Sequence, residues 1–195
     1  MKKRIMVVED ESIVRLDVSL MLEDAGYNVV AQAGDGEKAV EKAFELEPDL
    51  IIMDIKMPKL NGLKASEIIS NRTNTPILLL TAYSQKEFVA KAKEANILGY
   101  LVKPVTEASL IPAVEIAMKQ AENANAFREK IIKLDKKLQG RKMIEKAKGI
   151  LMTRLNVSED KAFQKMRKIS MDKQLPLERI ARKIIHKYEA KANKV

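Results

Sequence analysis

Residues 50–62 read LIIMDIKMPKLNG: four apolar residues run directly into an aspartate, and a proline and a glycine soon follow. A short, continuous apolar run bounded by turn-forming residues is typical of a strand buried on both faces of a sheet. Such a strand is a rigid support for whatever stands at its end. We therefore predict that residues 50–53 form a buried strand that holds the carboxylate of Asp54 at the rim of a sheet.

Four further apolar runs of this kind occupy residues 4–8, 28–33, 76–80 and 99–102. Helical patterns separate them. One helix ends at Gly26, one lies between Ser84 and Ala95, and one begins at Thr106 or Ser109. Five strands that alternate with helices predict an α/β fold, with a doubly wound, five-stranded parallel sheet over residues 1–120.

No strand pattern follows residue 109. Apolar and small residues instead recur at spacings that alternate between four and three, as in a coiled coil. These residues are Ala113, Ala117, Gln120, Ala124, Phe127, Ile131, Leu134 and Leu138. We predict a helical linker over residues 121–140, which either is exposed to solvent or pairs with a second copy of the chain.

Three amphipathic helices are predicted after Gly140, and they form a small all-α bundle over residues 141–195. Ser158 is placed to cap the second of them, where Glu159 and Asp160 suit the positive end of the helix dipole. The second helix is expected to bury Ala162, Phe163, Met166 and Ile169. The third presents Leu177, Ile180, Ala181, Ile184 and Tyr188 to the core.

The net charge of +9 is distributed unevenly along the chain. Residues 1–120 carry 15 Lys and Arg against 18 Asp and Glu, a net −3, whereas residues 121–195 carry 21 against 9, a net +12. A lysine-rich helical surface can simply be solvated. So strong an excess over a short segment nevertheless favours a polyanionic partner for the second half.

Composition excludes several classes of protein. The chain has no cysteine, which excludes disulfides, thiol nucleophiles and cysteine-ligated zinc. The apolar run near the N-terminus is too short for a signal peptide, and no run approaches the ~18 apolar residues of a membrane span. We expect a cytoplasmic protein without a membrane partner.

Polar residues stand where each of four predicted strands ends. Glu9 and Asp10 follow the first strand, Asp54 the third, Thr81 the fourth and Lys103 the fifth. The carboxyl ends of parallel strands meet at one edge, so these side chains should converge there. Three crowded acids repel one another, and Mg²⁺, a hard cation that prefers oxygen ligands, relieves that repulsion. Asp54 could then act as a nucleophile toward a phosphoryl donor, with Thr81 and Lys103 holding phosphate oxygens.

The segments VVEDE, MDIKMPKLNG, TAYS and GYLVKP resemble the receiver domain of two-component response regulators, over residues 1 to about 120. The resemblance implies a CheY-like, flavodoxin-like fold and phosphotransfer from a sensor histidine kinase to Asp54. It also implies Mg²⁺ held by Asp10, Asp54, a water shared with Glu9, and the backbone carbonyl of Lys56. By the same resemblance, Thr81 and Tyr100 form the pair that rearranges on phosphorylation, and Lys56 and Tyr83 influence phosphoryl lifetime.

Residues 143–171, MIEKAKGILMTRLNVSEDKAFQKMRKISM, resemble the ANTAR domain, the RNA-binding output of AmiR- and NasR-type antitermination regulators. The resemblance covers residues 141–188. It implies binding to paired hairpins in nascent mRNA, which prevents an overlapping terminator from forming. Two hairpins suggest two ANTAR domains and therefore a phosphorylation-dependent homodimer.

The basic residues that we expect to bind RNA are Lys142, Lys146, Lys148, Arg154, Lys165, Arg167 and Lys168. Gly149 lies beside Lys142 and Lys146 on a helical wheel, and an open surface there would admit a phosphate backbone. Lys148 borders the apolar arc of the helix. A simple alternative to RNA binding is that its aliphatic stem packs on that arc while its ammonium reaches solvent.

Three other functions remain open. The main alternative is a response regulator with a helical DNA-binding output, although LNVSEDKAF lacks a compact turn followed by a polar recognition helix. The second alternative is an enzyme, such as a phosphohydrolase that uses Asp54. No catalysis is expected of the basic half, because it adds no pair of nucleophile and base and His186 stands alone. In the first half, AGDGEK lacks the spacing of a phosphate-binding loop. A protein-only partner for the lysines is the third.

Overall fold

The computed structural model describes residues 2–82 and 96–192 of the 195-residue chain, and side chains as far as Tyr188. It forms two compact units, Met1–Asn125 and Ala126–Val195. The helix predicted between Ser84 and Ala95 lies outside the described residues, as does Tyr83.

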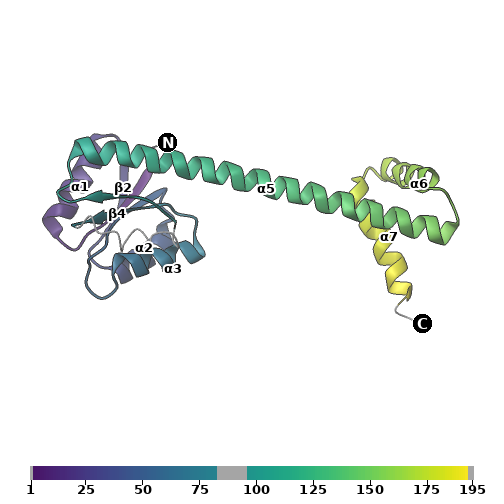
Figure 1. Ribbon diagram of the computed structural model, residues 1–195, viewed down its shortest axis with the longest axis horizontal. Helices are drawn as coiled ribbons and strands as arrows, with labels where there is room; N and C mark the ends of the chain where they lie inside the picture. Colours follow the sequence, from purple (N-terminus) through teal and green to yellow (C-terminus); the bar gives the residue numbers. More distant parts are fainter. Residues whose placement is uncertain (1, 83–95, 193–195) are drawn as a thin grey trace. The chain divides into compact units, whose positions relative to one another are not determined.

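The first unit is built on a five-stranded parallel sheet (Figure 1). Its strands are β1 (Arg4–Val8), β2 (Asn28–Ala33), β3 (Leu50–Asp54), β4 (Ile77–Thr81) and β5 (Ile97–Val102), in the order β2-β1-β3-β4-β5. All five predicted strands are confirmed, with ends that differ by no more than two residues. The strand order reverses between β1 and β3, which is where such sheets open a crevice for ligands.

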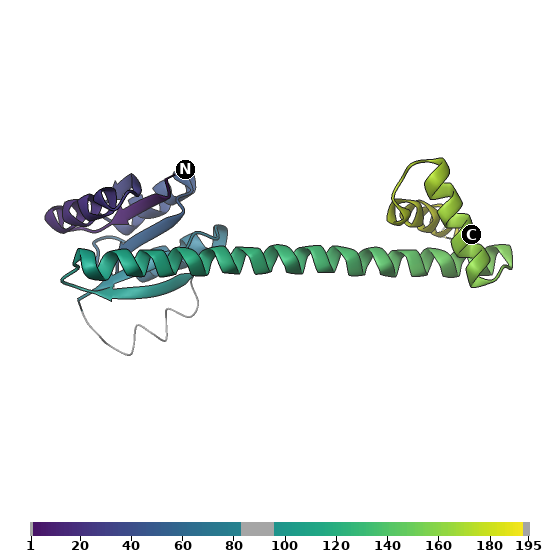
Figure 2. The same cartoon turned by 90° about the horizontal axis from the view of Figure 1, so that it is seen from above.

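Helices cover both faces of the sheet, as Figures 1 and 2 show. On one face, α1 (Ser12–Asp24) and the first part of α5 (Glu107–Leu155) pack on Ile5, Val7 and Ile52. On the other, α2 (Gly36–Leu46) and α3 (Gly62–Arg72) pack on Met6, Val8 and Ile51. Because successive strand residues face opposite layers, residues 5–8 of β1 and 50–53 of β3 are all apolar and almost fully buried.

The predicted helix ends in this unit are local effects of single residues. Gly26 follows α1 with φ of 89°, a conformation that favours glycine, and the chain turns there into β2. Of the two candidates for starting α5, Thr106 stands at the cap position, immediately before Glu107. The Ser109 hydroxyl oxygen accepts from the Thr106 N–H at 3.2 Å, which closes the first turn.

α5 is one continuous 49-residue helix, so the predicted linker and the first helix of the predicted bundle are not separate elements. Gly140 was expected to precede a new helix. A lone glycine costs a helix only about 1 kcal/mol relative to alanine, and the residues around it are good helix formers. It also has a packing role: a Cβ at this position would lie 2.9 Å from Cγ of Glu178.

The second unit contains the last part of α5, α6 (Glu159–Asp172) and α7 (Leu177–Ala192). Its core is formed by Ala147, Leu151, Ala162, Met166, Ile180, Ala181 and Ile184. The Ser158 side chain accepts from the backbone N–H of Lys161, which confirms the predicted cap of α6. No helix in the described segments is long and apolar enough to cross a membrane.

Phe163 is not in this core, contrary to prediction, and keeps 39% of its surface exposed. The buried arc of α6 runs through Ala162 and Met166 to Ile169, which are spaced by four and three residues. A residue next to Ala162 points about 100° away from that arc, so Phe163 reaches its edge only.

The predicted coiled-coil pattern on α5 divides into two parts. Ala113 and Ala117 pack against the sheet and belong to the core of the first unit. Phe127, Ile131, Leu134 and Leu138 lie in the second unit and are 52–65% exposed. This second part supplies the exposed large apolar residues of the pattern.

Candidate phosphoacceptor site and basic unit

Three acidic side chains meet at the carboxyl edge of the sheet, as predicted. Asp54 is the last residue of β3, and Glu9 and Asp10 directly follow β1. One carboxylate oxygen from each lies within 4.8 Å of the others. Glu9 and Asp54 are buried, whereas Asp10 is exposed.

Lys103 reaches into this cluster from the end of β5. Its Nζ lies 2.6 Å from Oε2 of Glu9 and 3.2 Å from Oδ2 of Asp54. The Lys103 backbone N–H donates to the carbonyl of Thr81 at 2.9 Å, which ties the ends of β4 and β5 together. The predicted grouping of Lys103 and Thr81 around Asp54 is therefore present.

Burial controls the electrostatics of the cluster. It raises the pKa of Asp54 and of Glu9 above their ordinary values, although the Lys103 ammonium opposes both shifts. Burial also acts to lower the pKa of Lys103, but the close contact with Glu9 and the charge of Asp54 outweigh it and raise that pKa. One ammonium thus supports two buried carboxylates, with a third acid beside them.

The donor set fits a hard divalent cation. Three carboxylates offer oxygen ligands from two adjacent strands. The Oε2 atom of Glu9 is buried, and no donor in the described part of the chain meets it in hydrogen-bonding geometry, although Lys103 lies close to it. A bound cation would neutralise the negative charge of the three carboxylates that the single Lys103 ammonium leaves uncompensated.

A cavity of about 250 Å³ opens beside the cluster, which gives a reactant access to Asp54. It is lined by Asp10, Glu11, Asp54, Ile55, Lys56, Thr81, Ala82 and Lys103. The backbone N–H groups of Ile55 and Lys56 stabilise the Asp54 carboxylate. Tyr100 does not line this cavity; it lies on β5 with 56% of its surface exposed.

Arg15 on α1 supports the loop that carries Glu9 and Asp10, a contribution that the sequence analysis missed. Its guanidinium donates to the backbone carbonyls of both acidic residues and to the Ser12 hydroxyl. Arginine often braces loop carbonyls because its donors form a fixed fork. A lone arginine on a helical pattern carried no signal of this role, because the contact depends on how α1 packs.

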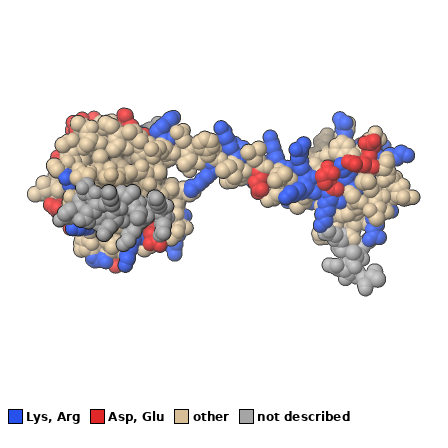
Figure 3. All heavy atoms as spheres, in the orientation of Figure 1, with Lys and Arg blue, Asp and Glu red and all other residues tan. Residues whose placement is uncertain are grey.

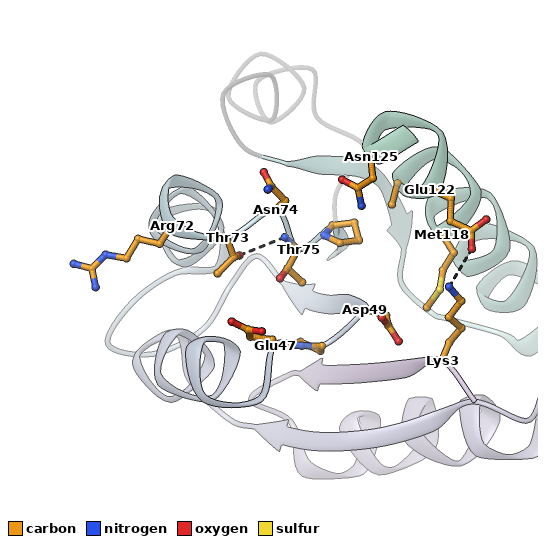
Figure 4. Close-up of a pocket in the computed structure, with 13 residues that line it drawn as sticks. Lys3, Glu47, Asp49, Arg72, Thr73, Asn74, Thr75, Met118, Glu122 and Asn125 are labelled. Atoms are coloured by element: carbon orange, nitrogen blue, oxygen red, sulfur yellow. Dashed lines mark hydrogen bonds and ion pairs between the residues drawn. The ribbon is translucent and has the colours of Figure 1, made fainter. Parts of the chain in front are cut away.

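A second cavity, of about 360 Å³, lies where the strands begin, at the edge opposite Asp54 (Figure 4). Lys3 before β1, Asp49 before β3 and Pro76 before β4 contribute to its walls. The Lys3 ammonium pairs with Glu122 of α5 at 3.0 Å, as the dashed line in Figure 4 shows. Both charge signs and several amides line this cavity, so it does not favour one class of ligand.

Basic side chains gather over the second half of α5 and the C-terminal helices, as the blue spheres in Figure 3 show. Six of the seven predicted RNA-binding residues are exposed there: Lys142, Lys146, Arg154, Lys165, Arg167 and Lys168. Gly149 is exposed too, and a Cβ added to it would meet nothing within 4 Å. The open surface predicted beside it is therefore present.

Lys148 differs from these six residues. Only 9% of it is exposed, and its ammonium lies 2.8 Å from a carboxylate oxygen of Glu145 and 2.6 Å from one of Glu159. Hydrogen bonds with Glu145 and Glu159 raise the pKa of Lys148. The residue ties α5 to the start of α6, and we exclude it from the surface available to RNA.

Comparisons with known proteins agree with both units. The response regulator receiver domain family matches residues 5–115, and the ANTAR domain family matches residues 133–185. The transcriptional regulatory protein PdtaR of Mycobacterium tuberculosis is 38% identical over 183 residues, which are 94% of this chain and 89% of that protein. The chemotaxis protein CheY of Thermotoga maritima is 36% identical over 115 residues, or 58% of this chain and 96% of that protein.

Solved structures show the same receiver fold. The chemotaxis protein CheY4 of Vibrio cholerae aligns with a TM-score of 0.57 and 32% identity, over 60% of this chain and 99% of that chain. The chain therefore belongs to the two-component response regulators, with an N-terminal receiver domain and a C-terminal ANTAR domain.

Proposed function

We propose that a sensor histidine kinase phosphorylates Asp54, and that the phosphorylated protein binds hairpins in nascent mRNA and prevents transcription termination. The observation that carries this proposal is the joining, in one chain, of a buried carboxylate cluster beside Lys103 with an ANTAR unit whose lysines and arginines are exposed. The first is an input for a phosphoryl group, and the second suits a phosphate backbone.

In the phosphotransfer step, an Asp54 carboxylate oxygen attacks the phosphorus of a phosphohistidine. A P–O bond forms, the P–N bond breaks, and the imidazole leaves with the electron pair and takes a proton from water. Glu9, Asp10 and Asp54, with the backbone carbonyl of Lys56, would hold Mg²⁺, which neutralises charge on the phosphoryl oxygens when bound. The Lys103 ammonium lies close enough to Asp54 to pair with an oxygen of the new group.

The switch residues are Thr81 and Tyr100. Thr81 lines the cavity beside Asp54, so its hydroxyl is placed to meet a phosphoryl oxygen. Tyr100 stands two register positions earlier on the neighbouring strand, opposite Leu79, where its exposed ring could move inward as Thr81 shifts. The phosphoryl group adds about −1.5 to −2 charge and needs only to bias two packings that differ by a few kcal/mol.

An exposed apolar stripe on α1 suits a kinase partner. Ile13, Leu16 and Leu20 are 48–84% exposed and are spaced by three and four residues, so they share one side of the helix. α1 begins two residues after Asp10, which places this stripe next to the acidic cluster. A partner helix packed there would bring its phosphohistidine near Asp54.

Dimer formation through α5 would supply two ANTAR units for two hairpins. Phe127, Ile131, Leu134 and Leu138 form an exposed apolar seam with coiled-coil spacing. The apolar side chains of such a seam are removed from water when a second helix packs against them. We propose that a second copy of the chain does so, and that phosphorylation favours that pairing.

The proposal is tested with an Asp54→Asn variant and two nucleic acids. Acetyl phosphate should label the wild-type protein and leave the variant unlabelled, and gel shifts should show labelled wild type binding hairpin leader RNA in preference to duplex DNA. Labelling of Asp54→Asn would place the phosphoacceptor elsewhere. Stronger binding to duplex DNA would favour a DNA-binding output.

A further inference from the structure

A groove of about 440 Å³ lies between α5 and α7 within the C-terminal unit. Lys142, Met143 and Lys146 contribute to it from α5, and Arg182, Ile185 and His186 from α7. Its volume is within the range of pockets that hold small organic groups, about 300–1,000 Å³.

The lining combines a polar rim with an apolar floor. Lys142, Lys146, Arg182 and His186 are exposed, whereas Met143 and Ile185 are half-buried. Met143 and Ile185 also pack against the core of the unit, so the floor is held in place from below. The groove is therefore a built feature of the α5–α7 packing and not a gap between mobile side chains.

None of the described residues that line the groove is acidic. Of the described carboxylates close in sequence to these residues, Glu145 pairs with Lys148 and Glu178 packs against Gly140. The close approach of α7 to α5 at Gly140 brings the helices together just before the groove. The described walls of the groove therefore carry basic side chains and no acidic one.

These properties match an unpaired nucleotide. A base offers two apolar faces, which fit over Met143 and Ile185, while the phosphates on either side of it are anionic. Arginine stacks on bases, and methionine sulfur makes favourable contacts with aromatic rings. A paired base hides its faces in the stack, so duplex RNA would meet the rim but leave the floor uncovered.

We propose that this groove holds one unpaired base of the bound RNA, with the flanking phosphates against Lys142, Lys146 and Arg182. This inference rests on the proposed RNA binding and adds to it the site that reads the RNA. It also adds Met143, Arg182, Ile185 and His186 to the interface. A purely acidic polypeptide such as polyglutamate would pair with the same cations but would leave the apolar floor uncovered.

The first test removes single bases from the RNA. Full-length protein treated with beryllofluoride selects hairpins from a pool with randomised loops, and each loop nucleotide is then replaced by an abasic residue, which keeps the phosphate. We expect one position where the replacement weakens binding about tenfold, the effect of one lost stacked base. If the pool yields no bound RNA, the proposed function itself fails. If hairpins bind but no abasic position matters, only this inference fails.

The second test locates that base with a matched pair of variants. Arg182 and Arg179 are both exposed on α7, but only Arg182 lines the groove. Arg182→Gln should weaken binding of the selected hairpin about tenfold, whereas Arg179→Gln, with the same loss of charge, should change it less than about twofold. In Arg182→Gln the penalty for the abasic residue should shrink, because a backbone that is no longer anchored at Arg182 holds the base less firmly over Met143 and Ile185.

Equal effects of the two arginine variants would overturn the proposal, as would an abasic penalty that stays at full size in Arg182→Gln. Ile185→Ala removes part of the floor without changing charge, and it should reduce the same penalty. Arg182→Gln gives the result independently if Ile185→Ala unfolds. Polyglutamate binding that depends on Arg182, with hairpin binding unchanged, would assign the groove to an acidic protein instead.

Discussion

Glu9 and Asp54 are carboxylates that the fold buries beside Lys103, and their raised pKa values predict how stability depends on pH. The ordinary pKa is 4.5 for Glu9 and 3.8 for Asp54. At a pH between the ordinary and the raised pKa of each group, the folded protein binds more protons than the unfolded chain. Their contribution to stability is therefore present at low pH and is lost as pH rises through that window.

Magnesium should reverse this loss, because it binds the deprotonated carboxylates. We expect the rise in melting temperature on adding Mg²⁺ to be larger at about pH 7.5 than at about pH 5. Calorimetry of wild type and Glu9→Gln, each with Mg²⁺ and with a chelator, measures the difference. A rise that is the same at both pH values, or equally large in Glu9→Gln, would contradict the assignment of these acids to a cation.

Gly62 is required for the backbone of Asp54 to take its position. A Cβ at Gly62 would overlap the carbonyl oxygen of Asp54, and the Gly62 N–H donates to the Ile55 carbonyl at 3.0 Å. Gly62→Ala should therefore lower stability by about 2 kcal/mol or more and slow phosphorylation of Asp54. Urea unfolding and acetyl phosphate labelling measure the two effects.

Gly149→Ala is the matched control for that substitution, because Gly149 lies in the open on α5. It should raise stability by up to about 1 kcal/mol, as alanine does at an exposed helical position. If neither glycine variant changed the free energy of unfolding, the inference that Gly62 and Asp54 are in close contact would be contradicted.

At the scale of single elements, the ion pairs of Lys148 join α5 to the N-terminus of α6. Lys148→Met keeps an apolar stem in the buried position but removes the charge that Glu145 and Glu159 face. We expect it to lower the melting temperature of the C-terminal unit while leaving the RNA affinity of folded protein nearly unchanged. Lys146 is exposed in the groove, so Lys146→Met should weaken RNA binding more than it lowers the melting temperature. RNA affinity lost only in Lys148→Met would return that residue to the interface.

The strands and their functional ends could be predicted because both depend on local pattern. Continuous apolar runs reveal strands buried on both faces, and parallel pairing then brings Asp10, Asp54 and Lys103 to one edge. The length of α5 could not be predicted in the same way. A glycine at position 140 is compatible with a helix end and with a helix crossing, and the contact with Glu178 that distinguishes them is tertiary.

The basic surface shows the same division. A charge count indicates that the second half is basic, but it does not separate Lys148, which is buried between two carboxylates, from Lys146, which is exposed. The sequence predicts Phe163 in the core, but one residue of rotation from Ala162 brings it to the edge. The sequence pattern did not indicate the roles of Arg15 and Arg182. The role of Arg15 depends on the packing of α1 beside the loop after β1, and that of Arg182 on the packing of α7 beside α5.

At the scale of the whole chain, the two units have different chemistry. The receiver unit offers a carboxylate for a phosphoryl group, and the ANTAR unit offers cations for a polyanion. α5 contributes residues to the cores of both units, so it is the element through which a change at β4 and β5 would reach the second. The proposed pairing with a second copy would depend on the exposed seam of α5, which contains Phe127, Ile131, Leu134 and Leu138.

The most direct measurement is a titration of a selected hairpin RNA with full-length protein, with and without beryllofluoride, alongside Asp54→Asn. Beryllofluoride mimics a phosphoryl group on an aspartate. We expect it to tighten RNA binding by wild type at least about tenfold, a coupling of about 1.4 kcal/mol, and to leave Asp54→Asn unaffected. Superimposable wild-type curves with and without beryllofluoride would contradict the control of RNA binding by Asp54.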